Sequence, residues 1–570
     1  MASHDPRIPL EGRAHVRGQQ LHPLSERTVG EWLAATSTTF PKQEAVVFPE
    51  LGLRWNWSEL HSLSQRLAAA LLALGFEKGD RLGIWSPNRP EWVLVQYATA
   101  HIGVILVNIN PAYRVAELEY ALNKVSCKGI VSADRFRTSA YLEMLVALAP
   151  ELARCPPGHL QSRNLPHLST VIKLGEDHSS GMYNFNALLQ QQDPDRLAQV
   201  QHISGTLSCH DPINIQFTSG TTGHPKGATL THHSVVNNAI DVARTMRYGA
   251  GDRLCIPVPL YHCFGMVMSS LASTVTGGTM VYPGEGFDPL ATLKAVHAER
   301  CTHLHGVPTM FIAQLDHPHF DAFDLSSLRG GIMAGSPCPI EVMKRVNTRM
   351  HMEEVTIAYG MTETSPVSFQ SGTDDPIERR VSTVGRVMPH LEVKIVDAEG
   401  NTAAVGDKGE LCTKGYSVMR GYWDDPERTA DALVDGWMHT GDLATIDEDG
   451  FCNIVGRVKD MLIRGGENVY PREVEEFLFA HPKIAQVQVF GIPDARYGEE
   501  VAAWIVLKPG TEASAEDIRS FCEDQISHYK IPKHIRFVAE LPMTVTGKAQ
   551  KFIMRQKMME ELGLSEIRTA

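Results

Sequence analysis

The spacing of apolar residues divides the chain into alternating helices and short strands. Between positions 60 and 76, leucines recur at helical intervals and stop near Gly75, which predicts a helix. Short apolar runs at 81–85 and 102–107 follow, each closed by Pro, Asn or Gly, and they predict strands. Helices that alternate with apolar strands predict α/β layers.

The pattern changes after about Val384, where short strands are separated by Gly and Asp turns. The final 110 residues or so return to mixed α/β character. The predicted strands of the first stretch cover 392–397, 409–413 and 451–455, and the C-terminal elements are a helix at 471–480, strands at 484–491 and 501–507, and a helix at 515–526. A chain of 570 residues is too long for one hydrophobic core, so several domains are expected.

The composition and net charge limit the classes of molecule that the protein is expected to bind. The chain is 43% hydrophobic and 21% charged, with a net charge of −13, which argues against nucleic acid and against anionic membranes. Anionic ligands would need local positive charge, and Lys226, Arg457, Lys459, Arg464 and Lys548 are candidates. The ten cysteines include no C-x-x-C pair, so we expect reduced thiols in a cytosol-like compartment.

One stretch has the length of a membrane span, because 254–284 contains no Asp, Glu, Lys or Arg. Its prolines, glycines and hydroxyl residues instead favour a strand, a turn and a buried helix, so no integral membrane segment is expected. The N-terminus has no apolar signal-peptide core, and Asp5 and Glu11 fit poorly with a transit peptide. We expect a cytoplasmic protein, or a mitochondrial matrix protein if a leader has been removed.

The segment from Thr218 to Gly227 is the most informative. It follows the strand-like run 213–217 and combines four hydroxyls, three glycines and one lysine, Lys226. Hydroxyls and unencumbered backbone N–H groups can bind a phosphate, and a lysine adds a point charge. Pro225 and Gly227 flank the lysine, so the segment is not a Walker A loop. A flexible Gly/Thr surface turn is the alternative interpretation.

This segment resembles the phosphate-binding loop of the ANL superfamily, which comprises acyl-CoA synthetases, peptide-synthetase adenylation domains and luciferases. The resemblance runs from about Trp32 to about Phe552, and the sequences at 259–262 and 306–310 look most like the fatty acyl-CoA synthetase branch. It implies a large N-terminal α/β domain, 1–458, with two βαβ-type layered sheets and a β-barrel-like part. A small mobile α+β domain, 459–570, would follow, with its hinge at Lys459.

The resemblance assigns residues to ATP. Those expected to contact the phosphates or the adenine, as a set, are Thr218, Ser219, Gly220, Thr221, Thr222, Gly223, Lys226, Gly335, Ser336, Pro337, Tyr359 and Gly360. Tyr359 offers a flat face to a purine, Thr362 a hydroxyl to a phosphate, and Glu363 a hard oxygen ligand to Mg²⁺. Taken alone, a turn at a strand end with an exposed acid would explain these residues equally well.

Three further positions complete the expected nucleotide site. Asp442, in a predicted Thr-Gly-Asp turn, and Arg457 match the ribose-binding pair, although an Asp beside Gly is usually only a turn former. Lys548 matches the adenylation lysine, which would bridge the substrate carboxylate and the α-phosphate. The ordinary interpretation of that lysine is a solvated surface residue.

The acyl and CoA sites are implied in the same way. His262 matches a residue near the reacting carboxylate, although a lone His in an apolar stretch is more often a core residue. The pocket could use Val307, Pro308, Thr309, Met333 and Ala334, and Gly465 and Gly466 match a segment that lines the pantetheine tunnel. Cys301, His303 and His305 alternate as zinc ligands could, but we find no fourth ligand and expect core or pocket lining.

The predicted function is therefore an ATP-, Mg²⁺- and CoA-dependent ligase that activates a medium-chain fatty acid through an acyl-adenylate. Short-chain, branched or aromatic acids, or loading of a carrier protein, are alternatives. A non-catalytic nucleotide-binding protein and a luciferase-type oxygenase are further ones. The expected partners are small molecules, and the protein is expected to be a monomer or a homodimer.

Overall fold

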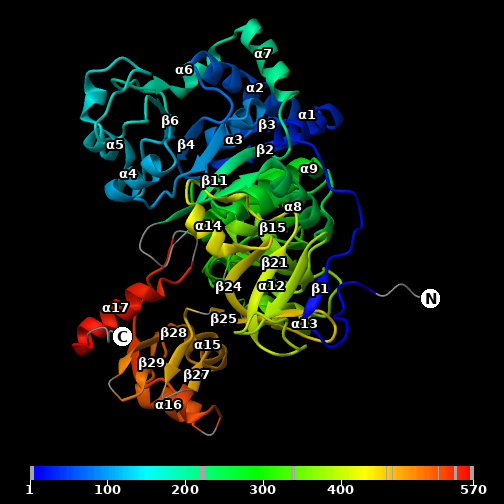
Figure 1. Ribbon diagram of the computed structural model, residues 1–570, viewed down its shortest axis with the longest axis vertical. Helices are drawn as coiled ribbons and strands as arrows, with labels where there is room; N and C mark the ends of the chain where they lie inside the picture. The colour runs from blue at the N-terminus through cyan, green and yellow to red at the C-terminus, as the bar shows by residue number, and fades with distance from the viewer. Residues whose placement is uncertain are drawn as a thin grey trace.

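The computed structural model describes residues 5–218, 225–335, 338, 340–457, 459–464, 467–494, 496–523, 525–544 and 548–564. Figure 1 shows a large part that contains the N-terminal and central residues, with a smaller part, orange to red, beside strand β25. Two wide mixed sheets and one antiparallel sheet make up the large part. The α/β fold that the sequence predicts is therefore confirmed.

The first wide sheet has eight strands. From β10 to β11 they run parallel, and β12 and β22 close it antiparallel. Its strands, in spatial order, are β10 (Tyr183–Asn184), β9 (Thr170–Lys173), β6 (Gly129–Ser132), β4 (Arg81–Trp85), β5 (Ile105–Asn108), β11 (Pro212–Thr218), β12 (Lys226–Thr231) and β22 (Gly421–Tyr422). The buried apolar strands of its centre are typical of a parallel sheet covered by helices.

One helix next to this sheet begins and ends close to where the sequence predicts. Helix α2 (Trp57–Ala73) begins with a capping box: the Glu59 backbone N–H donates to Asn56 Oδ1, and the Asn56 backbone N–H donates to Glu59 Oε2. The helix predicted at 60–76 and the strand predicted at 81–85 are both confirmed. The strand predicted to start at 102 starts only at Ile105, because helix α3 (Pro90–Ile102) includes residue 102.

The second wide sheet has nine strands and is parallel from β17 to β2. Its strands, in spatial order, are β19 (Arg386–Val387), β18 (Val367–Gln370), β17 (Glu354–Gly360), β16 (Gly330–Ala334), β15 (His303–Leu304), β13 (Arg253–Cys255), β14 (Thr279–Val281), β2 (Glu44–Phe48) and β3 (Leu53–Asn56). One continuous core of buried side chains joins the two wide sheets.

The uncharged stretch at 254–284 lies in this core. It forms the end of β13, a π-helix over Phe264–Leu271, helix α9 (Ala272–Thr276) and β14, and helix α8 (His232–Thr245) packs against it. The predicted strand and buried helix are confirmed. No helix in the described parts of the chain has the length and apolar character needed to cross a membrane.

The third sheet has six antiparallel strands: β1 (His15–Arg17), β20 (Glu392–Val396), β21 (Gly409–Lys414), β24 (Trp437–Ile446), β23 (Leu433–Val434) and β25 (Cys452–Arg457). The prediction that Thr440, Gly441 and Asp442 form a turn is wrong, because these residues lie inside β24. Gly441 adopts φ +70°, so a local irregularity of a long strand replaces the turn that its glycine suggested.

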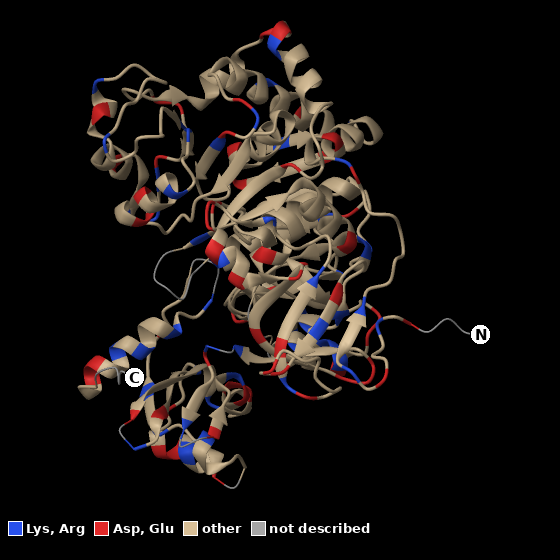
Figure 2. Cartoon of the chain, viewed as in Figure 1, with Lys and Arg blue, Asp and Glu red and all other residues tan. Residues whose placement is uncertain are grey.

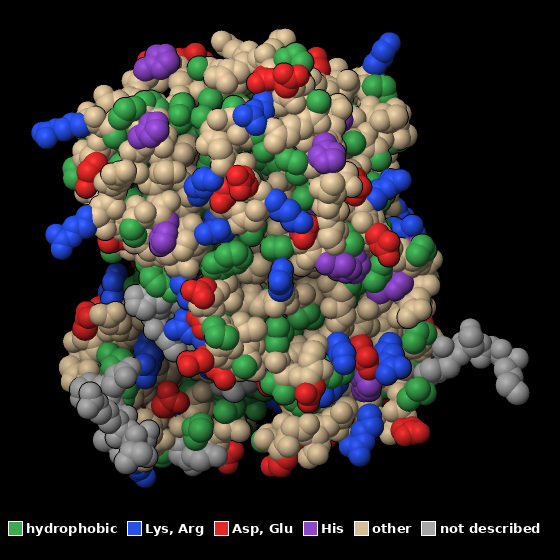
Figure 3. All heavy atoms as spheres, turned by 45° about the horizontal axis from the view of Figure 1, so that its top comes forward, with side chains coloured by type: hydrophobic (Ala, Val, Ile, Leu, Met, Phe, Trp, Pro, Cys, Tyr) green, Lys and Arg blue, Asp and Glu red, His purple; other side chains and the backbone are tan. Residues whose placement is uncertain are grey.

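The C-terminal part has its own sheet and its own buried apolar clusters. Its elements are β26 (Leu462–Arg464), β27 (Glu467–Val469), α15 (Pro471–Phe479), β28 (Ile484–Asp494), β29 (Gly498–Leu507), α16 (Ala515–Cys522), β30 (His534–Phe537) and α17 (Lys551–Leu562). The predicted C-terminal elements are confirmed, with α16 ending four residues earlier than expected. Basic and acidic residues are interspersed over both parts (Figure 2), and on the face drawn in Figure 3 they alternate as well.

Candidate active site

The described residues predicted to bind the phosphates and Mg²⁺ lie at the ends of strands. Thr218 ends β11 and Lys226 starts β12, so they flank the loop, while Glu363 follows the carboxyl end of β17. The Thr218 hydroxyl donates to Glu363 Oε1 at 3.0 Å, and the Tyr422 hydroxyl donates to the same oxygen at 3.0 Å. The Lys226 ammonium lies 4.7 Å from the centre of the Tyr422 ring. Tyr422 thus contacts both a buried carboxylate and a lysine.

Asp442 is the centre of a second group. Its Oδ2 accepts a hydrogen bond from the Tyr359 hydroxyl at 2.5 Å, and its Oδ1 accepts one from Arg457 Nε at 2.9 Å. Burial, followed by the charge of Asp442, raises the pKa of Tyr359 well above its ordinary value, so the phenol remains a donor. The charge of Asp442 raises the pKa of Arg457 as well. Tyr359 comes from β17, and the other two residues come from β24 and β25.

Lys548, from the C-terminal part, lies close enough to Asp442, Arg457 and Glu363 for their charges to affect its pKa. Desolvation lowers the pKa of Lys548, the charge of Arg457 lowers it further, and Asp442 and Glu363 oppose both effects. The residue as a whole is exposed. Lys548 closes a tight loop, because Thr544 N–H donates to its carbonyl oxygen at 2.7 Å and its own N–H donates to Thr544 Oγ1 at 3.0 Å. The C-terminal part thus places this lysine near charged residues of the large part.

His262 lies two residues before the π-helix, close enough to Lys548 for the lysine charge to affect its pKa. Its Nδ1 accepts the Phe264 N–H at 3.2 Å, which assigns the ring proton to Nε2. Burial lowers the pKa of His262 to about 3, with a smaller contribution from Lys548. The imidazole is therefore neutral near pH 7 and offers one N–H donor. A π-helix inserted among ordinary helices is often found at functional sites.

The predicted acyl-pocket residues lie on two neighbouring segments. Val307 and Met333 are buried, Ala334 N–H donates to the Gly306 carbonyl at 3.3 Å, and a Cβ on Gly335 would lie 3.2 Å from Val307. Pro308 and Thr309 begin helix α11 (Pro308–Leu315) directly after Val307. Gly335 adopts φ +90°, which explains a glycine at this position. The two segments form an apolar wall beside the end of β16.

The backbone at Gly360 also requires a glycine. A Cβ there would lie 1.8 Å from the Pro366 carbonyl oxygen, so any larger residue would displace the turn that carries Thr362 and Glu363. Several predicted site residues lie outside the described residues: Ser219, Gly220, Thr221, Thr222, Gly223, Ser336, Pro337, Gly465 and Gly466. Lys459 is described and exposed, two residues after Arg457.

The alternating Cys301, His303 and His305 belong to the core. All three are buried, His303 lies 3.5 Å from Asp252, and His305 Nδ1 lies 2.8 Å from the Ser269 hydroxyl. The other ring nitrogen of His305 meets the Tyr248 hydroxyl at 2.5 Å. These histidines have different partners, so the expectation of core or pocket lining is confirmed.

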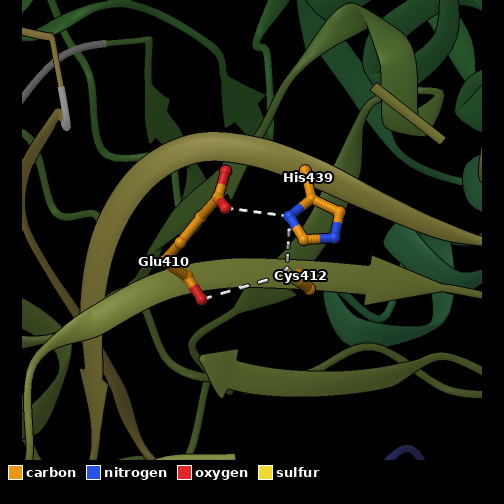
Figure 4. A group of neighbouring side chains, drawn as sticks. All are labelled: Glu410, Cys412 and His439. Atoms are coloured by element: carbon orange, nitrogen blue, oxygen red, sulfur yellow. Dashed lines mark hydrogen bonds and ion pairs between the residues drawn. The ribbon is translucent and has the colours of Figure 1, made fainter. Parts of the chain in front are cut away.

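Glu410, Cys412 and His439 form a cluster of side chains of the kinds that bind metal ions. In the described parts of the chain, the ligand atoms of Glu410, Cys412 and His439 lie within 4.8 Å of one another (Figure 4). Burial and the nearby Glu410 carboxylate raise the pKa of the Cys412 thiol to about 12, and Lys394 is its register partner on β20. His439 Nδ1 lies 2.8 Å from Glu410 Oε2 and 3.5 Å from Cys412 Sγ, so the three side chains form a hydrogen-bonded cluster.

Two residues of the site were not predicted from the sequence. Tyr422 follows a glycine in a two-residue strand, and nothing local connects it with Glu363, 59 residues earlier. Glu410 lies next to Asp442 through strand pairing alone. The alternation Glu410-x-Cys412 within a predicted strand is the one signal available, because it places both side chains on one face.

Comparisons with known proteins agree with this geometry. The family model for the AMP-binding enzyme matches residues 33–423, and that for the AMP-binding enzyme C-terminal domain matches residues 473–548. The chain therefore belongs to the AMP-binding, adenylate-forming enzymes of the ANL superfamily. Acyl-CoA synthetases match nearly the whole chain, and the chain has the acyl-CoA ligase class of activity.

Individual relatives cover nearly the whole chain. The Bacillus subtilis (strain 168) protein YngI, named for an acyl-CoA synthetase activity, is 48% identical over 547 residues, which are 95% of this chain and 99% of YngI. The mitochondrial medium-chain acyl-CoA ligase ACSF2 of Danio rerio is 46% identical over 563 residues, 98% of this chain and 93% of its own. The crystal structure of the anthranilate CoA ligase AuaEII with anthranoyl-AMP superposes with a TM-score of 0.84 and 25% identity, covering 95% and 99% of the two chains.

Proposed function

We propose that this enzyme activates a medium-chain fatty acid with MgATP and transfers the acyl group to CoA. In the first step a carboxylate oxygen attacks the α-phosphorus, an acyl-adenylate forms, and pyrophosphate leaves. In the second step the CoA thiol attacks the acyl carbon, AMP leaves with the bonding electrons, and the thiol proton is released. A thiol of ordinary pKa and a good leaving group make a strong general base unnecessary in this step.

The observation that carries this proposal is the meeting of Lys548 with the groups around Asp442 and Glu363. The electrostatic influence of both carboxylates reaches Lys548, as does that of Arg457. An ammonium placed there would neutralise the substrate carboxylate and the α-phosphate as they approach each other. His262, neutral and with Nε2–H free to donate in the first step, would orient the carboxylate.

The nucleotide roles follow from the same groups. The loop that starts at Thr218 and Lys226 would hold the phosphates, Asp442 and Arg457 the ribose hydroxyls, and Tyr359 and Gly335 the adenine. Glu363 fits a Mg²⁺ ion, since both hydrogen bonds from described residues end on its Oε1, and oxygen ligands suit Mg²⁺. A bound Mg²⁺ would neutralise charge on the departing pyrophosphate. The 459–570 region would then rotate about Lys459 to admit CoA.

The length of the acid rests on two arguments. The π-helix and the segment after Gly306 supply buried apolar side chains beside His262, among them Phe264, Met266 and Val307, and a charged acyl tail there would lack a partner. The ACSF2 relative is a medium-chain enzyme by name. A panel of carboxylic acids scored for CoA-dependent AMP formation tests this proposal. It predicts the highest kcat/KM for octanoate-length acids, and a preference for anthranilate, dicarboxylates or amino acids would contradict it.

A further inference from the structure

The carboxylate of Glu410 joins two strands at the point where β24 becomes irregular. Its Oε1 accepts the Gly441 backbone N–H at 2.9 Å, and its Oε2 lies 2.8 Å from His439 Nδ1. Figure 4 shows Glu410 and Cys412 on β21 facing His439 on β24. One side chain thus holds residues on both sides of Thr440.

The strand register shows why such a bond is needed. Glu410 pairs with Leu443 and Cys412 pairs with His439, so Leu411 alone stands opposite Thr440, Gly441 and Asp442. The two extra residues form a bulge, and bulged residues lose regular ladder bonds. The Gly441 N–H is one of the donors released from the ladder, and Glu410 satisfies it with a charged acceptor.

The remaining bonds of the bulge lead directly to Asp442. Thr440 Oγ1 donates to the Leu411 carbonyl at 2.8 Å and accepts the Asp442 N–H at 3.1 Å. Asp442 then presents its carboxylate to Tyr359 and Arg457. If the Gly441 N–H lost its acceptor, the bulge could flatten, and a shift of one residue would turn Asp442 to the other face of the sheet.

We propose that Glu410 is a positioning residue for nucleotide recognition: by anchoring the Gly441 N–H, it fixes the bulge that aims Asp442 at the two ribose hydroxyls. This inference rests on the ribose role given to Asp442 in the proposed function. The role proposed for Glu410 is indirect, because it acts through the bulge and Asp442. The aim of Asp442, and with it the preference for a ribose over a hydroxyl-free sugar, depends on the bond from Glu410.

Equilibrium binding of MgATP and of Mg-2′,3′-dideoxy-ATP to the full chain tests the inference without any acid substrate. In Glu410→Ala, the affinity for ATP is expected to fall about tenfold, as for loss of a charge-assisted hydrogen bond, while dideoxy-ATP binding changes little. Glu410→Gln keeps an oxygen for the Gly441 N–H and should retain most of the discrimination.

Glu392 supplies a matched control on the neighbouring strand β20. Its carboxylate also pairs with a histidine, His15, at 2.6 Å, and its side chain is 25% exposed, against 27% for Glu410. Its hydrogen-bond and ion-pair partners are His15 and Arg17, on β1, away from the bulge, so Glu392→Ala should bind both nucleotides like the parent enzyme.

The inference is overturned if Glu410→Ala keeps the parental preference for ATP, or if it loses both nucleotides equally, as a merely structural residue would. If Glu410→Ala does not fold, Glu410→Asp takes its place. The Asp side chain is one methylene shorter, so its carboxylate cannot reach the Gly441 N–H, and the same loss of discrimination between ATP and dideoxy-ATP is expected. A parent enzyme that binds ATP and dideoxy-ATP equally would overturn it too. An enzyme that discriminates between them but activates no fatty acid would contradict only the proposed substrate.

Discussion

Arg457 donates a hydrogen bond from Nε to Oδ1 of Asp442 at 2.9 Å, and the two residues are direct register partners on β25 and β24. Tyr359 holds the other carboxylate oxygen from β17, so Asp442 links the nine-stranded sheet with the antiparallel sheet. Arg457 also lies two residues before Lys459, where we place the hinge. A ligand that binds to Asp442 and Arg457 would therefore contact the chain directly beside the proposed hinge.

Replacing Lys548 separates the two half-reactions. Lys548→Ala should lower acid-dependent pyrophosphate release a hundredfold or more, on the order of what a single charge-stabilising group contributes. Thioester formation from purified acyl-adenylate and CoA should stay within about threefold of the parent rate, because only the first step brings two anions together. Lys557→Ala, an exposed lysine on α17, is the control. Equal loss of both half-reactions would refute the separate role.

Glu363 should control the dependence on Mg²⁺. Glu363→Gln is expected to raise the Mg²⁺ concentration for half-maximal adenylation tenfold or more, because an amide is a weaker ligand for a hard cation. Tyr422→Phe removes one donor to Glu363 but leaves its charge, so it should change the Mg²⁺ requirement far less. Similar Mg²⁺ titration curves for Glu363→Gln and the parent would contradict the assignment.

Burial of His262 predicts a pH-dependent contribution to stability. Its folded-state pKa, about 3, lies below the ordinary 6.5, so acid protonates the unfolded chain first. The contribution is present above pH 6.5 and is lost as the pH falls through that value toward 3. Between pH 7.5 and pH 5, His262→Gln should therefore lose less free energy of unfolding than the parent, by on the order of 1 kcal/mol.

Denaturant titrations at the two pH values measure this difference. His319→Gln, which replaces an exposed histidine, should lose as much stability as the parent. A His262→Gln variant with the parental pH dependence would show that the ring is protonated in the folded enzyme as readily as in water.

Stiffening the hinge should spare the first step and block the second. Lys459→Pro fixes φ near −65° and restricts rotation at the residue where we propose the hinge. We expect pyrophosphate release within about threefold of the parent and acyl-CoA formation reduced at least tenfold. Lys459→Ala, which keeps backbone freedom, should support both steps. A proline variant with a normal rate of acyl-CoA formation would move the hinge elsewhere.

Much of the fold could be predicted from the sequence, because its core elements are strongly periodic. The leucines of α2 and the apolar run of β4 have unambiguous helical and strand patterns. The Thr-Gly-Asp segment was mispredicted as a turn, because a glycine with positive φ has the same sequence signature in a turn and in a bulge. The π-helix was not predicted either, since its apolar residues fit an ordinary buried helix.

The site was predictable only where its chemistry is local in sequence. Thr362 and Glu363 follow directly after a strand, and Thr218 and Lys226 flank one loop. Glu410 and Tyr422 act through pairing between distant strands, and no short motif marks either of them. The convergence of Lys548 on Asp442 depends on how the two parts of the chain pack, which no periodic pattern encodes.

The product stoichiometry of one reaction tests directly whether the enzyme is an AMP-forming fatty acid–CoA ligase. The enzyme is incubated with octanoate, MgATP and CoA, and nucleotides and thioesters are quantified together. We expect one AMP and one pyrophosphate for each octanoyl-CoA, with no ADP, and an octanoyl-adenylate that accumulates when CoA is omitted. Formation of ADP and phosphate, or of AMP without any octanoyl-CoA, would contradict it.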